Sequence, residues 1–246
     1  MRARQAGSVY QLTFLPRLFP VNCYLVEEEK ELTLIDAALP YSAKGILEAG
    51  ARIGKPITRI VLTHAHGDHV GALDALKQAL PNAQVLISRR DHRLLQGDVG
   101  LEPGERNTPI KGGVPKTLQT RADVLLSEGD MVGSLRAIAV PGHTPGHMAF
   151  YDERSGALIA GDALQTRGGI AVAGVVNPWF PFPAFGTWDA DAALVSARKL
   201  RELKPSLLAV GHGAMLAQPQ QALEKAIRDA EKAMEKRNKH GLQTRA

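Results

Sequence analysis

The sequence is poor in cysteine. Cys23 is the only cysteine among 246 residues, so the chain cannot form an internal disulfide bond and gives no disulfide sign of export. Cys23 stands in the apolar run 21–26, where a thiol serves as a small buried apolar side chain. No cysteine is therefore expected among metal ligands.

Long apolar runs are also missing. No stretch of about 18 apolar residues occurs, so no membrane-spanning helix is expected. The N-terminus carries charges without the apolar run that a signal peptide needs. These absences predict a soluble, cytoplasmic protein with no membrane partner.

Blocks of like charge are absent as well. Lys and Arg number 30 against 25 Asp and Glu, a formal net charge of +5, and no five like charges follow one another. This balance alone gives no argument for a nucleic-acid partner. With 44% apolar residues and no linker or short repeat, the chain fits a single globular domain over residues 1–246.

Histidine, by contrast, is concentrated in one place. Three histidines and a carboxylate fall within six positions after the apolar run 60–62, which predicts a buried strand: His64, His66, Asp68 and His69. Residues 69–80 have apolar side chains at helical spacing and predict a helix. Because imidazole and carboxylate suit zinc and similar ions, we expect a divalent metal on this strand-to-helix turn.

Four other predicted strands end in the same way. Each is followed directly, or after a Gly or Pro-Gly turn, by a residue of a type that can bind metal: Asp36, His143, Asp162 and His212. Loops at strand ends converge on one edge of an α/β sheet, where the strands hold them rigid. Five such strand ends therefore predict one shared site.

The remaining pattern predicts alternating strands and helices. We expect strands at 9–15, 21–26, 31–36, 57–63, 84–88, 123–126, 135–140, 148–152, 157–160 and 207–210. We expect helices at 41–53, 69–80, 91–95 and 189–203, and a C-terminal helix at about 219–239. The Gly- and Pro-rich stretch 96–117 predicts a long lid or binding loop.

The motif His64-Ala-His66-Gly-Asp68-His69 resembles the His-x-His-x-Asp-His motif of the metallo-β-lactamase superfamily. His143 in Pro-Gly-His, Asp162 in Gly-Asp and His212 in Gly-His-Gly resemble its later motifs, and the resemblance covers about residues 9–216. It implies an α/β fold with four αββα layers, two sheets packed face to face with helices outside.

The resemblance also implies a centre of two divalent ions, zinc above all, with manganese, iron or cobalt as alternatives. His64, His66 and His143 would hold one ion, and Asp68, His69 and His212 the other, with Asp162 between them. Hydroxide held by both ions would attack an ester, lactone, thioester or amide-like carbonyl of a small molecule. Asp162 or Asp68 would act as a catalytic residue by carrying the proton to the leaving group.

Several residues near these motifs have supporting or neutral interpretations. Asp36 and His147 are expected to orient ligands rather than to bind metal. His92 lies in a polar cluster that is typical of a solvated face, and His240 lies in a basic tail. Gln165 takes the place of a tyrosine found three residues after the bridging aspartate in the lactonases of the superfamily, which argues against a close lactonase assignment.

Residues 177–188 hold five of the twelve aromatic side chains. A stretch of this composition, with prolines between the rings, is typical of an apolar wall for a substrate, and packing over a sheet edge or a homodimer contact are the alternatives. The five are Trp179, Phe180, Phe182, Phe185 and Trp188.

Other activities of the superfamily fit less well. A nuclease or phosphodiesterase would need a basic path for nucleic acid, and none is visible. Glyoxalase II has a larger C-terminal region, and a sulfur dioxygenase with one iron would not need all six terminal ligands. We therefore expect a metallo-hydrolase, with the other activities as alternatives.

Overall fold

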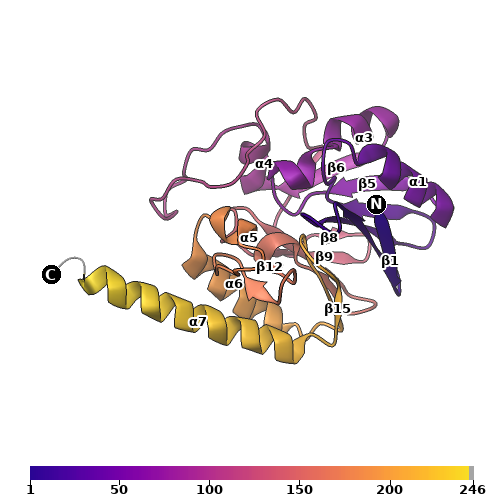
Figure 1. Ribbon diagram of the computed structural model, residues 1–246. Helices are drawn as coiled ribbons and strands as arrows, with labels where there is room; N and C mark the ends of the chain where they lie inside the picture. The colour runs from indigo at the N-terminus through magenta and orange to yellow at the C-terminus, as the bar shows by residue number, and fades with distance from the viewer. Residues whose placement is uncertain (244–246) are drawn as a thin grey trace.

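The computed structural model describes residues 1–243, with side chains through residue 237. Two β-sheets lie between two layers of helices (Figure 1). One sheet has seven strands in the order β1-β2-β3-β4-β5-β6-β7, and the other has six in the order β15-β14-β11-β10-β9-β8. A two-stranded ribbon, β12-β13, lies apart from both.

The N-terminal half of the chain forms the first sheet. Its strands are β1 (Arg2–Ala6), β2 (Val9–Phe14), β3 (Val21–Glu27), β4 (Leu32–Ile35), β5 (Ile57–Val61), β6 (Gln84–Ser88) and β7 (Val124–Leu126). Strands β4 to β7 run parallel, so each connection must cross over the sheet. The helices of these crossovers are α1 (Ala43–Ile53), α2 (Gly67–Val70), α3 (Leu73–Ala79) and α4 (Arg89–Leu95).

The C-terminal half forms the second sheet and its helical cover. The strands are β8 (Met131–Val132), β9 (Leu135–Ala139), β10 (Met148–Asp152), β11 (Ala157–Ile159), β14 (Leu207–Ala209) and β15 (Leu216–Ala217), with the ribbon of β12 (Leu164–Gln165) and β13 (Ala171–Val172). The helices are the 3₁₀ turn η1 (Gly161–Ala163), α5 (Phe182–Phe185), α6 (Ala190–Glu202) and α7 (Gln220–Gln243). Asp189 caps α6 by accepting hydrogen bonds from the N–H groups of Asp191 and Ala192.

Three apolar cores separate the four layers. Along β3, Tyr24 and Val26 face the second sheet, whereas Cys23 and Leu25 face the helices of the first half, because successive side chains of a strand point to opposite faces. A third core packs the second sheet against α6 and α7. Both faces of the central strands are buried, which explains their continuous apolar sequence. The αββα order and the buried cysteine were therefore predicted correctly.

The predicted continuous helix at 69–80 is wrong. The chain forms α2, leaves the helical path near Gly71, and resumes as α3. The N–H of Gly71 donates to the carbonyl of Ala38 at 2.8 Å, and a Cβ at Gly71 would lie 2.7 Å from that carbonyl oxygen and from Pro40. A long-range backbone contact therefore breaks a helix that the apolar spacing favours.

The first strand was missed altogether. Strand β1 lies at the edge of its sheet, pairs only with β2 among the described residues, and is exposed along nearly its whole length. Charged side chains are typical of edge strands. Because β1 carries them, its sequence lacks the apolar alternation by which a strand is recognised.

Helix α7 extends past its predicted end at 239 and runs along the outside of the second sheet (Figure 1). Leu223, Ala226, Ile227 and Ala230 are buried against α6 and the sheet. The side chain of His240 lies outside the described residues. No helix in the described part of the chain has the length and apolarity to span a membrane.

Candidate metal centre

The structure brings together the seven residues that the sequence singled out as ligands. His64 and His66 lie on the turn after β5, Asp68 and His69 on α2, His143 between β9 and β10, Asp162 in η1 after β11, and His212 after β14. Their donor atoms form three groups, each within 4.8 Å: His64, His66 and His143; His64, His69 and Asp162; Asp68, His69 and His212. Both sheets therefore contribute donors to one cluster.

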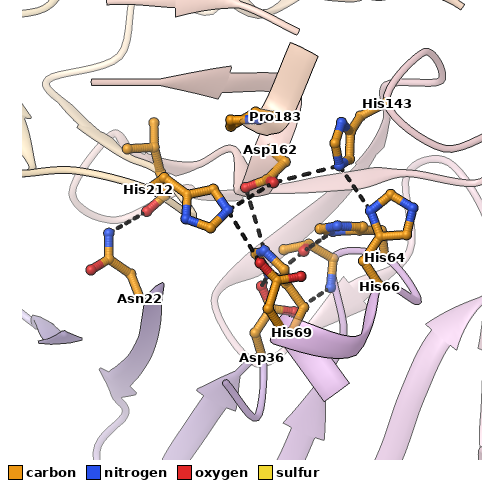
Figure 2. A network of polar contacts seen from close by, with 12 residues as sticks. Asn22, Asp36, His64, His66, His69, His143, Asp162, Pro183 and His212 are labelled. Carbon is orange, nitrogen blue, oxygen red and sulfur yellow. Dashed lines mark hydrogen bonds and ion pairs between the residues drawn. The ribbon is translucent and has the colours of Figure 1, made fainter. Parts of the chain in front are cut away.

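Asp162 lies at the middle of this cluster (Figure 2). Its Oδ2 is 3.4 Å from His143 Nε2 and 3.1 Å from His212 Nε2, and its Oδ1 is 3.4 Å from His69 Nε2. His212 Nε2 is also 3.4 Å from Asp68 Oδ2. Asp162 therefore faces His143 of the first group and both His69 and His212 of the third, and its carboxylate lies between the two groups.

Each imidazole of the cluster has its outer nitrogen engaged by the protein. The contacts are His64 Nδ1 with Thr63 Oγ1 at 3.0 Å, His66 Nε2 with the Lys111 carbonyl at 2.9 Å, His69 Nδ1 with Asp36 at 2.8 Å, His143 Nδ1 with Thr187 Oγ1 at 3.1 Å, and His212 Nδ1 with the Pro20 carbonyl at 2.7 Å. A carbonyl or carboxylate partner requires an N–H on the outer nitrogen, which leaves the inner nitrogen free to bind metal in the neutral ring.

Three of the inner donor atoms have no hydrogen-bond partner. His64 Nε2, His69 Nε2 and Asp162 Oδ1 are buried without a hydrogen bond, and His66 Nδ1 faces His143 Nε2 at 3.0 Å. Buried polar atoms normally have partners, so their convergence calls for a bound cation. Imidazole nitrogens and carboxylate oxygens are a donor set that fits divalent zinc, iron or manganese.

The electrostatics divide the cluster in two. Burial lowers the pKa of His64 and His143 well below the ordinary value. Burial also acts to lower the pKa of His69 and His212, but neighbouring carboxylates outweigh it and raise both, that of His212 to about 10. In the metal-free cluster, protons on His69 and His212 therefore balance the charges of Asp68 and Asp162.

Asp36 holds the ligand turn in place. Its Oδ1 accepts the N–H of Thr63 at 2.8 Å, and its Oδ2 accepts both Thr63 Oγ1 and His69 Nδ1 at 2.8 Å. Asp36 has a φ of 62°, a left-handed conformation that aspartate tolerates better than most residues. Asp36 therefore contacts the outer nitrogen of His69 and orients this ring without facing the inner space of the cluster.

His147 contacts the backbone rather than the inner space. Its Nε2 accepts the N–H of Asp162 at 3.1 Å, so the ring is neutral with its proton on Nδ1. Burial lowers its pKa to about 3, which keeps the ring an acceptor at neutral pH. This contact fixes the turn that carries the central carboxylate.

Asp91 has a structural role that the sequence reasoning missed. Its carboxylate accepts the N–H of Ala65 at 3.1 Å, the hydroxyl of Thr144 at 2.7 Å and the N–H of Gly146 at 2.8 Å. It thereby ties the His64–His66 turn to the loop of His143. The surrounding cluster 89–93 was expected to be a solvated face, but Asp91 is completely buried. Its place just after β6 was the available signal, since it marks one more strand end that carries an acid.

Polar side chains of β2 and β3 brace the His212 turn and were also missed. Asn22 Nδ2 donates to the carbonyls of Val210 and Gly213, and Tyr24 Oη donates to Val210. Figure 2 shows Asn22 beside the turn that carries His212. Gln11 Nε2 donates to Gly213 at 2.8 Å. These bonds join the first sheet to the last ligand of the second.

A cavity of about 110 Å³ opens onto the cluster. Its lining includes His66, Asp68, His143, Asp162 and His212, together with Phe19, Gly112, Gly113, Phe182, Pro183 and Gly186. Gly112 and Gly113 belong to the loop between α4 and β7, which contains the lid or binding loop predicted at 96–117, whereas Gly186 directly follows α5. A Cβ at Gly112 would lie 2.2 Å from His66 Nε2, so the close approach of this loop requires glycine.

The five aromatic residues of 177–188 lie in different surroundings: one lines the cavity, two are buried elsewhere and two are exposed. Phe182 lines the cavity, and Phe180 is buried against Phe19 and the ring of His212. Trp188 is buried and donates from Nε1 to the Thr108 carbonyl. Trp179 and Phe185 are 84% and 63% exposed. A shared wall role therefore has direct geometric support only at Phe182, and Phe19 is a wall residue that the sequence reasoning missed.

Comparison with known proteins finds one matching family model and several similar proteins. Residues 16–212 match the family model described as the metallo-beta-lactamase superfamily. The chain is 59% identical over 232 residues to the uncharacterized protein YobT of Bacillus subtilis, covering 94% of this chain and 100% of that protein. It is 34% identical over 151 residues to a hydroxyacylglutathione hydrolase of Gloeobacter violaceus, covering 60% of this chain and 50% of the relative.

Solved structures agree with the fold. The crystal structure of TTHA1623 in a di-iron-bound form has a TM-score of 0.64 and 28% sequence identity, covering 86% of this chain and 96% of that chain. The predicted four-layer fold is thus confirmed, and one structural neighbour holds two metal ions.

Proposed function

The chain belongs to the metallo-β-lactamase superfamily, and on that premise we propose that it is a hydrolase with two divalent metal ions that cleaves an ester, lactone, thioester or amide-like bond. The observation that carries the proposal is the convergence of inward-facing donors, with His64 Nε2, His69 Nε2 and Asp162 Oδ1 buried and without a hydrogen bond. Family membership and the hydroxyacylglutathione hydrolase relatives support a metal-dependent hydrolase.

The donor groups support the ligand assignment that the resemblance implies. His64, His66 and His143 would hold one ion, Asp68, His69 and His212 the other, and Asp162 both. Bound divalent ions supply two effects at such a site: they acidify water, so that a nucleophile forms near neutral pH, and they polarise the attacked oxygen. Zinc is the metal that we expect, and iron is the chief competitor.

Asp68 is the better of the two candidates for moving a proton to the leaving group. Both oxygens of Asp162 face imidazoles, which leaves neither free to carry a proton. Asp68 lines the cavity, its side chain is 27% exposed, and only its Oδ2 faces His212. Asp68 is therefore the carboxylate that we propose passes the proton to the departing thiol or alcohol.

The cavity favours a carbonyl substrate. Phe19, Phe182 and Pro183 supply apolar lining, and among the described residues no Lys or Arg lines this cavity. Apolar walls of this kind suit an acyl group better than the ionised oxygens of a phosphodiester. The acyl-glutathione substrate named for the relatives contains a carbonyl of the favoured kind.

Metal analysis of purified protein, with activity assays, tests the proposal. We expect about two divalent ions per chain, and hydrolysis of at least one member of a panel of lactones, thioesters, β-lactams and phosphodiesters assayed with zinc and manganese. His66→Ala and Asp162→Asn should abolish this turnover, whereas His92→Ala, outside the cluster, should retain it. A single iron per chain would instead favour the dioxygenase alternative.

A further inference from the structure

A second cavity, of about 220 Å³, lies beside the metal cluster and is lined by three arginines, Arg2, Arg4 and Arg167. Its lining contains no acidic residue. We propose that this arginine pocket binds a phosphate-bearing arm of the substrate, an inference that rests on the proposed hydrolase function and narrows its substrate class.

The two cavities share a wall. Phe19 and His212 line the metal cavity, while the residues that follow them, Pro20 and Gly213, line the arginine pocket. The backbone N–H of Arg167 donates to the His212 carbonyl at 3.3 Å. One end of the arginine pocket is therefore fixed to a proposed metal ligand.

The pairing of β1 and β2 explains why two of the arginines point toward this turn. Arg4 lies opposite Gln11 across the two strands, and Arg2 lies opposite Thr13. Residues opposite one another in a sheet share a face, and Gln11 reaches from that face to the Gly213 carbonyl. The same face of β1 therefore presents Arg2 and Arg4 to the residues around Gly213.

The charges of the pocket are not neutralised from within the protein. Among the residues whose side chains the structure describes, Arg2, Arg4 and Arg167 form no ion pair with a carboxylate. Protection of an edge strand would account for arginines on β1. It would not account for Arg167, which comes from the segment between β12 and β13 and lines the same cavity.

Guanidinium groups are well suited to phosphate. Their planar N–H groups bind two oxygens of a phosphate at once, and they stay charged at every physiological pH. The favoured substrate is therefore an acyl ester or thioester whose leaving arm carries phosphate. In its hydrolysis a bond forms between the acyl carbon and the oxygen of water, the acyl C–S or C–O bond breaks, and the leaving thiol or alcohol takes up the proton.

Direct binding tests the pocket independently of any activity. Inorganic pyrophosphate is titrated calorimetrically into metal-loaded protein, and metal content is measured afterwards to show that the ions remain. We expect Arg4→Glu and Arg167→Glu each to weaken binding by about tenfold or more, and Arg4→Lys to retain part of it. Arg121→Glu is the matched control, because it precedes β7 at the opposite edge of the sheet from β1.

Equal binding by all variants, or no binding by the wild type, would overturn the proposal; equal binding would place pyrophosphate elsewhere, on the metal ions for example.

A kinetic comparison then tests whether the arginine pocket binds the phosphate-bearing arm of a substrate. One acyl group is presented on coenzyme A, whose arm carries phosphates, and on N-acetylcysteamine, whose arm does not. The arginine variants should have a higher KM for the acyl-coenzyme A substrate with an unchanged kcat. Their kcat and KM for the acyl-N-acetylcysteamine substrate should equal those of the wild type. If neither acyl substrate is hydrolysed by any of these proteins, the wild type included, the result would instead count against the hydrolase function.

Discussion

At the scale of single residues, the cluster depends on side chains that never reach its interior. Asp91 is the clearest case, because its carboxylate joins the turn of His64 to the loop of His143. Two of its three donors are backbone N–H groups, which cannot rotate away as a hydroxyl can. The position of His143 relative to His64 therefore depends on a residue 52 positions before His143 in the chain.

Asp91→Asn should loosen this join. An amide has one acceptor oxygen, so the N–H of Ala65 or of Gly146 is left buried without a partner, at a cost of about 1–3 kcal/mol. We expect lower stability in urea and metal affinity reduced by about 10- to 100-fold, as is typical when a residue that orients ligands is lost. Asp98→Asn, with an exposed carboxylate just beyond α4, should change neither; unaltered metal affinity in Asp91→Asn would show that the join is dispensable.

The protons of the metal-free cluster give a second prediction. Although burial lowers the pKa of His212, Asp162 and Asp68 raise it overall to about 10. A pKa raised in the folded state adds stability that is complete below the unfolded value near 6.5 and is lost as the pH rises toward 10. The melting temperature of metal-free protein should therefore fall by several degrees between pH 7 and 10. Metal-loaded protein, whose ligands are already deprotonated, should show a smaller fall, and so should metal-free His212→Gln; parallel curves for all three would refute this assignment.

At the scale of elements, the long segment between α4 and β7 carries part of the cavity without any helix or strand of its own. Arg90 pairs with Glu105 near its start, and Arg106 pairs with Asp189 and Asp191 at the start of α6. Farther along, the carbonyl of Gly113 accepts the N–H of Gly67 at 2.8 Å. The segment is therefore held at separated points, and its glycines are held against the ligand turn.

Arg106→Ala should release the middle of this segment. Exposed ion pairs contribute little to global stability, so the melting temperature should change little. Hydrogen exchange of residues 107–113 should become faster, because Arg106 is the charged anchor next to this stretch and the hydrogen bonds that hold the stretch itself are single ones to carbonyls, and KM for an identified substrate should rise. Arg93→Ala, which removes pairs with Asp98 and Glu102 at the start of the segment, is the matched control. Unchanged exchange at 107–113 would show that Arg106 does not hold the segment.

The same scale shows why the sequence predicted some parts and not others. The ligand residues could be found because each follows an apolar strand, and the strand register fixes where it emerges. The break at Gly71 could not be found, because it depends on the carbonyl of Ala38 more than thirty residues away. Phe19 and the short helix α5 were missed for a similar reason: their apolar side chains have no period, and only the packing of the chain shows which of them meet the cavity.

At the scale of the whole molecule, the proposed ions would connect the two sheets. His64, His66, Asp68 and His69 come from the first half of the chain, and His143, Asp162 and His212 from the second. A ligand that binds only the folded state stabilises it by RT ln(1 + [L]/Kd), or about 4 kcal/mol at a thousandfold excess over Kd. Bound metal would therefore add to the apolar core in holding the halves together.

Removal of metal should accordingly lower the melting temperature, by on the order of 10 °C for a chain of this size. Dialysis against a chelator, followed by calorimetry and by readdition of zinc, measures the effect and its reversal. A double variant, His64→Ala with His66→Ala, which lacks two ligands of one ion and keeps those of the other, should show a smaller fall on chelation than the wild type. A wild-type protein that is indifferent to chelation would argue against ions that connect the sheets.

The order in which the ligands occur along the chain has a consequence for biosynthesis. The His64–His69 turn leaves the ribosome well before His212, the last of the seven. Until β14 has joined its sheet, the early histidines form only an open and incomplete chelate. Stable uptake of the proposed ions would therefore await synthesis of the chain through His212, so the cation acquired would be set by what is available to the folded protein rather than to the nascent chain.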